Sequence, residues 1–272
     1  MRMIGHLTGQ VRRPAAIAAA VLSAGLAVAA APAAAASACH AVSGPATVPL
    51  VELFTSEGCD SCPPADRWLS SEFPPLPTRT SPLALAFHVD YWDRLGWRDR
   101  FASAQFTQRQ HDEMSANGAT FVYTPQILVQ GHDAPGWNRG KVAEAIAAAA
   151  RRPPRATIAL DVAPGANAPQ LRATAAVEDV ALRKNAVLWL AFTDSGHVTD
   201  VAAGENRGVR LRHDHVVRSL HGPYRLDANG TAAASVAIAS PVDAGTSPMV
   251  VAFVQDTKNG EVLQSLAASE CR

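Results

Sequence analysis

Hydrophobic and polar positions divide the chain into two parts of different texture. In the first part, short apolar runs that predict buried strands alternate with longer segments that predict helices. The expected order is strand 48–54, helix 63–69, strand 83–89, helix 101–116, strand 121–129 and helix 140–150. Alternation of this kind is typical of an α/β domain, which we place at residues 46–152.

The pattern changes after the segment Arg-Arg-Pro-Pro-Arg at residues 151–155. Short apolar runs separated by Asn, Asp, Gly and Pro then predict strands at 156–162, 171–177, 186–192, 209–220, 232–238 and 249–255. Several short strands at this spacing indicate an all-β, sandwich-like domain, here residues 155–272. The predicted fold class is therefore an α/β domain followed by a smaller all-β domain.

The first 38 residues predict a secretory signal peptide. Arg2, Arg12 and Arg13 precede the uncharged apolar stretch 15–30, and small residues follow it up to Ala38. The stretch is too short and too rich in Ala to favour a membrane-spanning anchor. A lipid anchor on Cys39 is disfavoured, because Ala stands three residues before it. We therefore expect an exported protein, periplasmic or secreted.

Charge excludes one class of partner. The predicted signal peptide holds three of the 24 basic residues and none of the 24 acidic ones, so residues 39–272 carry 21 basic and 24 acidic residues, a net charge of −3. A nucleic-acid-binding surface would be strongly basic, so no nucleic-acid partner is expected. No later segment is long and apolar enough to span a membrane.

The pair Cys59 and Cys62 carries the chemistry. It follows the apolar strand and Gly58, at a predicted helix start, where positions three apart share a face. Free N–H groups and the helix dipole favour a thiolate there, the species that attacks disulfides. We expect Cys59 to lie exposed as the attacking thiol and Cys62 to lie one turn inside as the resolving thiol.

A strand, a CxxC pair and a helix start in an α/β domain resemble the thioredoxin fold. That fold has a second signature, a cis-proline at the start of a later strand, and Thr124-Pro125 stands at the corresponding place. Proline is the residue for which a cis peptide bond is least unfavourable. The alternative is an ordinary trans proline at a strand start.

Four segments extend the resemblance over nearly all of the exported chain: 51–59, 87–93, 123–126 and 204–206. Together they look like a group of bacterial exported thioredoxin-like proteins, the domain of unknown function 1223 family. The resemblance implies a thioredoxin-like domain and a smaller β-rich domain. It implies no established substrate.

Several residues are predicted to line a cleft beside the cysteines. Ligands of open α/β sheets lie at the carboxyl ends of strands, where His88, Asp90, Tyr91 and Trp92 follow a strand. The alternative is a structural aromatic cluster around a satisfied core histidine. The other expected cleft residues are Glu57, Asp60 and Thr124. Trp97, Arg98 and Arg109 are expected in packing and surface ion pairs, with Glu205 and Asn206 in a loop that contacts the first domain.

The sequence thus predicts an exported thiol–disulfide oxidoreductase that acts on protein thiols or disulfides, with no cofactor. Its site residues are Cys59, Cys62 and Pro125. One alternative is a non-enzymatic thioredoxin-like binding module with a structural CxxC disulfide. A less favoured alternative is a Cu or Zn site with His88 as third ligand. His213 and His215 offer either a second metal site or exposed histidines on one strand face.

The remaining cysteines lie at the two ends of the exported chain. We expect a structural disulfide between Cys39 and Cys271, since four cysteines in an oxidising compartment favour pairing. Closing so long a loop stabilises by about 4–5 kcal/mol on the chain-entropy model. The alternative is two free or intermolecular thiols.

Overall fold

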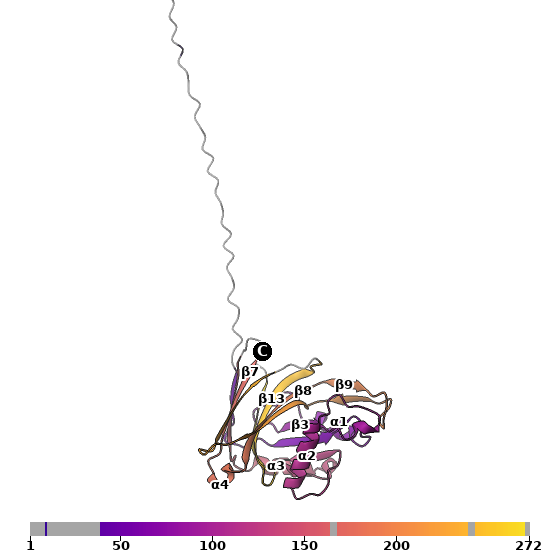
Figure 1. The fold of residues 1–272 in the computed structure, drawn as a ribbon, viewed down its shortest axis with the longest axis horizontal. Helices are drawn as coiled ribbons and strands as arrows, with labels where there is room; N and C mark the ends of the chain where they lie inside the picture. Colours follow the sequence, from indigo (N-terminus) through magenta and orange to yellow (C-terminus); the bar gives the residue numbers. More distant parts are fainter. Residues whose placement is uncertain (1–8, 10–38, 164–167, 239–242, 270–272) are drawn as a thin grey trace, which may run out of the picture. The chain divides into compact units, whose positions relative to one another are not determined.

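A mixed eight-stranded sheet runs through the protein (Figure 1). The computed structural model describes residue 9 and residues 39–163, 168–238 and 243–269, and these described residues from Cys39 onward belong to one folded unit. The strands, in spatial order, are β14 (Val262–Ser269), β13 (Thr246–Asp256), β8 (Ala186–Ser195), β11 (Val216–Arg225), β3 (Leu83–His88), β2 (Leu50–Thr55), β4 (Gln126–Val129) and β5 (His132–Asp133).

Two smaller sheets and four α-helices complete the described fold. A four-stranded sheet has the order β1 (Cys39–Val42), β6 (Thr157–Ala163), β7 (Gln170–Ala176) and β12 (Thr231–Ala237); β9 (His197–Asp200) pairs with β10 (Arg210–His213). The helices are α1 (Pro63–Glu72), α2 (Ala104–Ala116), α3 (Lys141–Ala150) and α4 (Val180–Arg183), with 3₁₀ turns at Asp93–Leu95 and Trp137–Arg139. No helix in the described ranges is long and apolar enough to cross a membrane.

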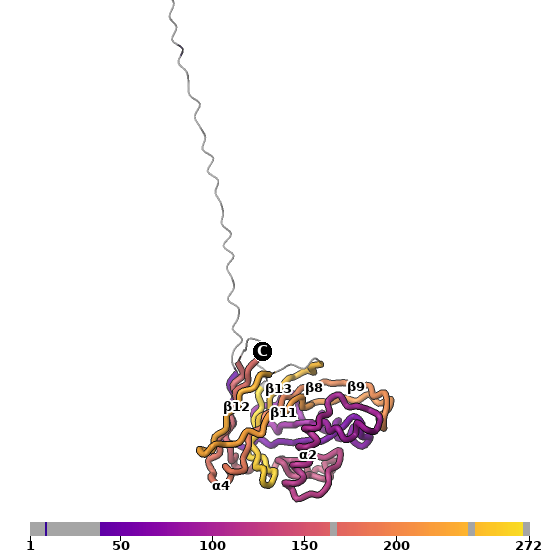
Figure 2. The backbone as a smooth tube through the Cα atoms, viewed as in Figure 1, coloured from indigo at the N-terminus to yellow at the C-terminus, as the bar shows by residue number. Residues whose placement is uncertain are grey.

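Strand β13 shows how the large sheet is buried on both faces. Val250, Ala252 and Val254 belong to the core shared with the four-stranded sheet, while Val251 and Phe253 belong to the core beneath α2. Successive side chains of a strand point to opposite faces, so this alternation follows directly from the sequence. In Figure 2, β13 lies between β12 and α2, as the two cores require.

The other end of the large sheet is covered by helices on both faces. In β3, Leu85 and Phe87 belong to the core that contains Phe106 of α2. Ala84 and Ala86 belong to a third core, to which α1 and α3 contribute. The helix α2 therefore covers one face of the sheet, and the opposite face is shared between the four-stranded sheet and the pair α1 and α3.

The predicted fold class is wrong. The structure is mostly β-sheet, with strands from both parts of the chain in one mixed sheet, and not an α/β thioredoxin-like domain followed by a smaller all-β domain. The junction is a parallel pairing of β11 with β3, at Val216 and Ala86, where the Ala86 N–H also donates to the His215 carbonyl at 2.8 Å. An unpaired edge of β3 would expose N–H and C=O groups, and β11 satisfies them. The alternation of strands and helices along the sequence does not show which strand pairs with that edge of β3.

The predicted strand 209–220 is two strands, β10 and β11, in different sheets. His215 between them has a φ of 58°, in the left-handed region that a strand cannot use. The predicted signal peptide lies outside the described residues except for Gly9. Cys271 also lies outside them, so its pairing with Cys39 stays a prediction.

Candidate functional site

The cysteine pair lies between β2 and α1, as the sequence predicts. Cys59 and Cys62 form a disulfide with Cα atoms 5.4 Å apart. Cys62 is the N-cap residue of α1, and its carbonyl accepts hydrogen bonds from the N–H groups of Ala65 and Asp66. Prolines occupy the first helical positions, where a missing N–H leaves no helical hydrogen bond unmade. The disulfide is therefore fixed at the amino end of the helix.

Thr124 brings the distant proline segment to the outer cysteine. The Thr124–Pro125 peptide bond is cis, which confirms the prediction for this bond. The Thr124 hydroxyl donates to Cys59 Sγ at 3.4 Å, and the indole N–H of Trp92 donates to Thr124 Oγ1 at 2.8 Å. Ser61 Oγ lies 3.3 Å from the same sulfur. Two hydroxyl groups thus face Cys59.

A loop from the C-terminal part of the chain covers the cysteines. The Asn206 side-chain amide donates to the carbonyls of Glu57 and Cys59, both at 2.9 Å. Glu205 accepts from the Asp60 N–H at 3.3 Å. We call residues 201–209, which connect β9 to β10, the cover loop. Its contact with the cysteines agrees with the expectation for Glu205 and Asn206.

Both cysteines are fully buried. Their exposed fraction is 0%, whereas Asp60 and Ser61 between them are exposed. The expectation of an exposed Cys59 sulfur is therefore wrong. Sequence patterns place the pair at a helix start, but they do not show that the cover loop, about 145 residues further along the chain, folds over it.

Buried ionisable groups adjoin the cysteine loop, by which we mean residues 56–62 between β2 and α1. His88 Nδ1 is 2.6 Å from Asp99 Oδ2, which also accepts from the Glu57 N–H at 2.9 Å. His213 Nε2 lies 3.4 Å from Glu57 Oε1, and its Nδ1 lies 3.9 Å from Asp66 Oδ2. All five residues are buried. Together with the disulfide they form what we call the cysteine compartment.

Burial and pairing act against each other in this compartment. Burial lowers the pKa of His88, but the Asp99 carboxylate outweighs it and leaves that pKa raised. Burial likewise raises the pKa of Asp99, and the imidazole of His88 outweighs it, so that pKa is lowered. The two shifts describe one ion pair of charged His88 and Asp99. Burial also raises the pKa of Asp66, and there the nearby histidines do not reverse the effect.

The carboxylate of Glu57 points inward, away from solvent. Burial raises its pKa, but the neighbouring His213 imidazole and the Trp97 indole N–H contribute to a net lowering. The Trp97 indole N–H donates to Glu57 Oε2 at 2.8 Å. Trp97 therefore belongs to the compartment, and its expected role in packing alone is too narrow.

Two of the predicted cleft residues form hydrogen bonds with the helix α2. Asp90 accepts a hydrogen bond from the Thr107 hydroxyl at 2.6 Å, and the Tyr91 hydroxyl donates to Gln110 Oε1 at 3.2 Å. Both partners belong to α2. These two side chains fix the helix α2 against the end of β3.

Sequence reasoning missed Asp66, Asp99 and His213 as members of the compartment. His213 was expected with His215 on one strand face, as a metal site or as exposed side chains, yet both are buried and they do not share a strand. A pattern was available only for Asp66, which stands one helical turn after Cys62. Asp99 and His213 reach the compartment through tertiary folding.

Metal binding gains no geometric support. Among the residues that the structure describes, no group of three or more His, Cys, Asp or Glu side chains is arranged to hold a metal ion. His88, the predicted third ligand, directs Nδ1 to Asp99.

Two solved structures resemble this chain in fold. One is a crystal structure of the protein AGR_C_4864 from Agrobacterium tumefaciens, with a TM-score of 0.56, 21% identity, and coverage of 82% of this chain and 94% of that one. The other is HBP35 of Porphyromonas gingivalis, with a TM-score of 0.56, 14% identity, and coverage of 82% and 75%. At these identities the likeness concerns the fold alone. No curated protein matches the chain.

The family is shown by sequence. The family model described as "Protein of unknown function (DUF1223)" matches residues 50–255, which contain the cysteine pair, Thr124–Pro125 and the cover loop. The chain belongs to the DUF1223 family.

Proposed function

We propose that the protein is an exported thiol–disulfide oxidoreductase whose reactive group is the Cys59–Cys62 disulfide. The observation that carries the proposal is the placement of this disulfide at the start of α1, with the Thr124 hydroxyl on Cys59 Sγ. Hydroxyl donors and a helix amino terminus both favour a thiolate on the outer sulfur when the bond is broken. This arrangement resembles the sites of thioredoxin-like redox proteins. We infer that the cysteine site of this protein is of the same kind.

The proposed reaction transfers two electrons from a substrate dithiol to the disulfide. A substrate thiolate attacks Cys59 Sγ, the bond between Cys59 and Cys62 breaks, and Cys62 leaves as a thiolate that takes up a proton. The second substrate thiol loses its proton and attacks the mixed disulfide. This releases an oxidised substrate and reduced Cys59. The proposed substrates are protein thiols, and no cofactor is required.

A purely structural role gains little from so short a loop. The two cysteines are separated by three positions, and closing a ring of that size stabilises by about 2 kcal/mol on the chain-entropy model. Bridges that tie distant segments stabilise more. The spacing therefore supports a reactive pair better than a structural staple.

Access to the sulfur requires that the cover opens. Asn206 and Glu205 contact the cysteine loop through three hydrogen bonds, and both cysteines are buried beneath them. We propose that the cover loop moves away from the cysteines when a substrate binds. The substrate would first contact the exposed residues Asp60 and Ser61. The export signal expected at residues 1–38 would deliver the protein to an oxidising compartment, where such a disulfide persists.

The complete burial favours one second candidate, a binding module in which the disulfide is structural. The two candidates differ in the reactivity of Cys59. In the Cys62→Ser variant of the full chain, Cys59 is left as a lone thiol. Exposure to glutathione disulfide, followed by intact-mass measurement, reports whether it forms a stable mixed disulfide.

The oxidoreductase proposal predicts one glutathione on Cys62→Ser within minutes and none on the double variant Cys59→Ser/Cys62→Ser. An unmodified Cys62→Ser protein that retains its fold by circular dichroism supports the structural role instead. Modification only after addition of urea has the same meaning, because the thiol is then reached by unfolding.

A further inference from the structure

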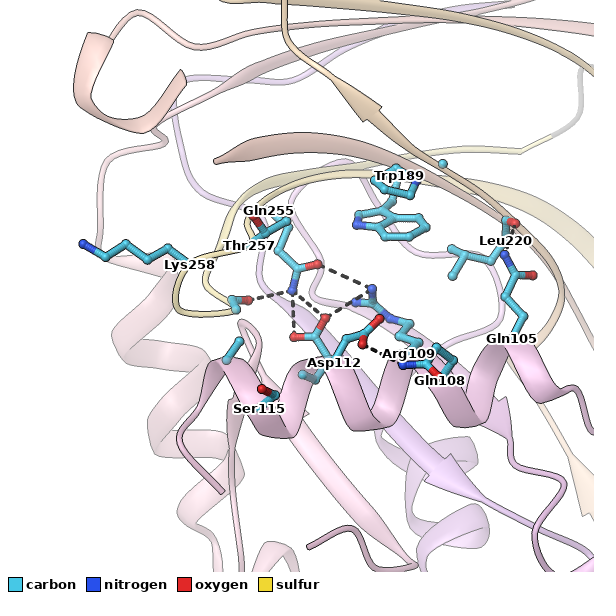
Figure 3. A pocket seen from close by; sticks show the side chains of 15 residues that line it. Gln105, Gln108, Arg109, Asp112, Ser115, Trp189, Leu220, Gln255, Thr257 and Lys258 are labelled. Carbon is cyan, nitrogen blue, oxygen red and sulfur yellow. Dashed lines mark hydrogen bonds and ion pairs between the residues drawn. The ribbon is translucent and has the colours of Figure 1, made fainter. Parts of the chain in front are cut away.

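A pocket of about 700 Å³ lies between α2 and the large sheet, and none of its lining residues belongs to the cysteine loop (Figure 3). Pockets of roughly 300–1,000 Å³ accommodate small molecules. On one side it is lined by α2, including Arg109, Asp112 and Glu113. On the sheet side it is lined by strands β8, β11 and β13, including Trp189 and Gln255.

A buried polar network forms the floor of this pocket. Arg109 donates through Nε to Glu52 Oε1 at 2.8 Å, and its Nη1 lies 3.3 Å from Glu113 Oε1. Gln255 Nε2 donates to both carboxylate oxygens of Glu113, at 2.9 and 2.8 Å. All four residues are buried, and Figure 3 shows Arg109 and Gln255 directed toward one another. We call them the Arg109 network; the expectation of a surface ion pair for Arg109 is wrong.

The charges of the network cancel only when Glu113 is protonated. Glu52 is fully buried and accepts two hydrogen bonds from Arg109, so this pair is neutral as a unit. Glu113 is then a second carboxylate on the same guanidinium, and it lines the pocket. Asp112 adds another acidic group at the rim. The basic residue at the rim, Lys258, extends away from the network in Figure 3.

Part of the sheet side of the pocket is apolar. Trp189 and Leu220 lie across from α2 in Figure 3, and Pro223 completes this wall. The Arg109 guanidinium lies 5.5 Å from the Trp189 ring centroid, so the indole already faces a cation within the pocket. A flat apolar wall beside excess carboxylate charge is complementary to a flat organic cation.

We propose that this pocket binds a small organic cation with a flat apolar body, whose charged group pairs with Glu113 and whose body lies against Trp189. The ligand class follows from charge complementarity and from the shape of the wall. The inference is independent of the redox proposal, because the two sites share no residue.

The protonation of Glu113 supports this assignment. Burial raises its pKa to about 7, although Arg109 and Gln255 act to lower it and Glu52 and Asp112 act to raise it. The charged groups that face it are thus Glu52 from β2 and Arg109 and Asp112 from α2. A bound cation lowers the pKa of a carboxylate, so binding near pH 7 should release a fraction of a proton from Glu113.

Three probes of similar shape and different charge test the proposal by calorimetric titration of the full oxidised chain. They are benzamidine as the cation, benzamide as the neutral molecule and benzoate as the anion. We expect benzamidine to bind at least tenfold more tightly than benzamide, and benzoate to bind most weakly. Titration at pH 7 in two buffers of different ionisation enthalpy should show proton release for benzamidine only.

Glu113→Gln should weaken benzamidine binding about tenfold, leave benzamide within about twofold, and abolish the proton release. The matched control is Glu144→Gln, which makes the same change at an exposed position of α3. Equal binding of benzamidine and benzamide, tighter binding of benzoate, or no saturable benzamidine binding up to about 10 mM would overturn the proposal. The ranking of the three probes on the unaltered protein decides the matter even if Glu113→Gln does not fold.

Discussion

The cysteine compartment and the Arg109 network are both buried and charged, but they differ in how completely their polar atoms are paired. In the compartment and the adjoining end of β2, six side-chain atoms among the described residues have no hydrogen-bond partner: Thr55 Oγ1, Glu57 Oε1, Asp66 Oδ2, His88 Nε2 and both ring nitrogens of His213. In the described Arg109 network, Glu52 Oε2 is the one such atom.

This difference indicates where the protein opens. A buried polar group without a partner costs about 1–3 kcal/mol, and opening to water removes that cost. Exposure of the compartment would break the His88–Asp99 pair but would hydrate six unpaired atoms, whereas exposure of the Arg109 network would break its hydrogen bonds and ion pairs and hydrate only one. We infer that the cover loop is a low-stability region and that the helix α2 stays fixed on the sheet.

Removing the Arg109 guanidinium should produce the largest loss of stability. Arg109→Met leaves Glu52 as an uncompensated buried carboxylate and removes the cation beside Glu113, and breaking a buried ion pair in this way costs about 3–5 kcal/mol. Urea unfolding at pH 7 measures the loss. The control Arg210→Met removes an exposed ion pair with Asp200 and should change stability by less than about 1 kcal/mol. Equal losses for the two variants would contradict the assignment of Arg109.

Breaking the ion pair in the compartment should have a smaller effect. Asp99→Asn removes a charged hydrogen bond to His88, and we expect a loss of about 2 kcal/mol near pH 6. The pKa of His88 is raised above 6.5, so the stability from this pair is lost as pH rises through that raised value.

At low pH, the stability that the pair contributes in the unaltered protein depends on the pKa of Asp99. Its pKa is lowered below 3.8, so the contribution is present above 3.8 and is lost as pH falls through the lowered value. The difference between Asp99→Asn and the unaltered protein should therefore shrink at both ends of the pH range. A constant difference from acid to alkaline pH would show that the pair does not change its charge on unfolding.

The cover loop can be loosened through one side chain. Asn206→Ala removes two hydrogen bonds to the cysteine loop and should cost about 1–2 kcal/mol. If reduction proceeds through opening, the rate of reduction by dithiothreitol should rise about 5- to 30-fold. The matched control Asn229→Ala changes an exposed turn residue and should leave this rate unaltered. Equal rates for all three proteins would show that the cover loop does not limit access.

The smallest expected effect is a pH dependence of the stability that is caused by the titration of Glu113. Because its pKa is raised to about 7 from 4.5, the folded protein binds a proton that the unfolded chain has released. Stability should therefore fall by about 1 kcal/mol between pH 6 and pH 8, and Glu113→Gln should remove this decline. A decline that persists in Glu113→Gln belongs to another group, such as His88.

Local patterns in the sequence predict local structure well. The apolar run before Cys59 is β2, the prolines after Cys62 begin α1, and the Thr124–Pro125 bond is cis. Each of these features depends on residues that are neighbours in the chain. The alternating burial of β6 and β7 likewise follows from their sequence periodicity.

Long-range pairing could not be predicted in the same way. Strand β11 adds to β3, and β1 pairs with β6 more than a hundred residues further along. Strand β14 was not predicted, because the small residues at its end dilute its apolar signal. The closing of Asn206 over the cysteines is also long-range, and it reverses the expected exposure of Cys59. Local structure around the cysteines was therefore predictable, and their accessibility was not.

The reduction potential of the Cys59–Cys62 disulfide tests the central claim most directly. The full chain is equilibrated with glutathione buffers of increasing reducing strength, and the fraction reduced is read from the mass after thiol alkylation. A reactive pair predicts a potential between about −120 and −270 mV, the range of working oxidoreductases. A potential below about −300 mV would contradict the account, because the disulfide would then be a permanent structural bond.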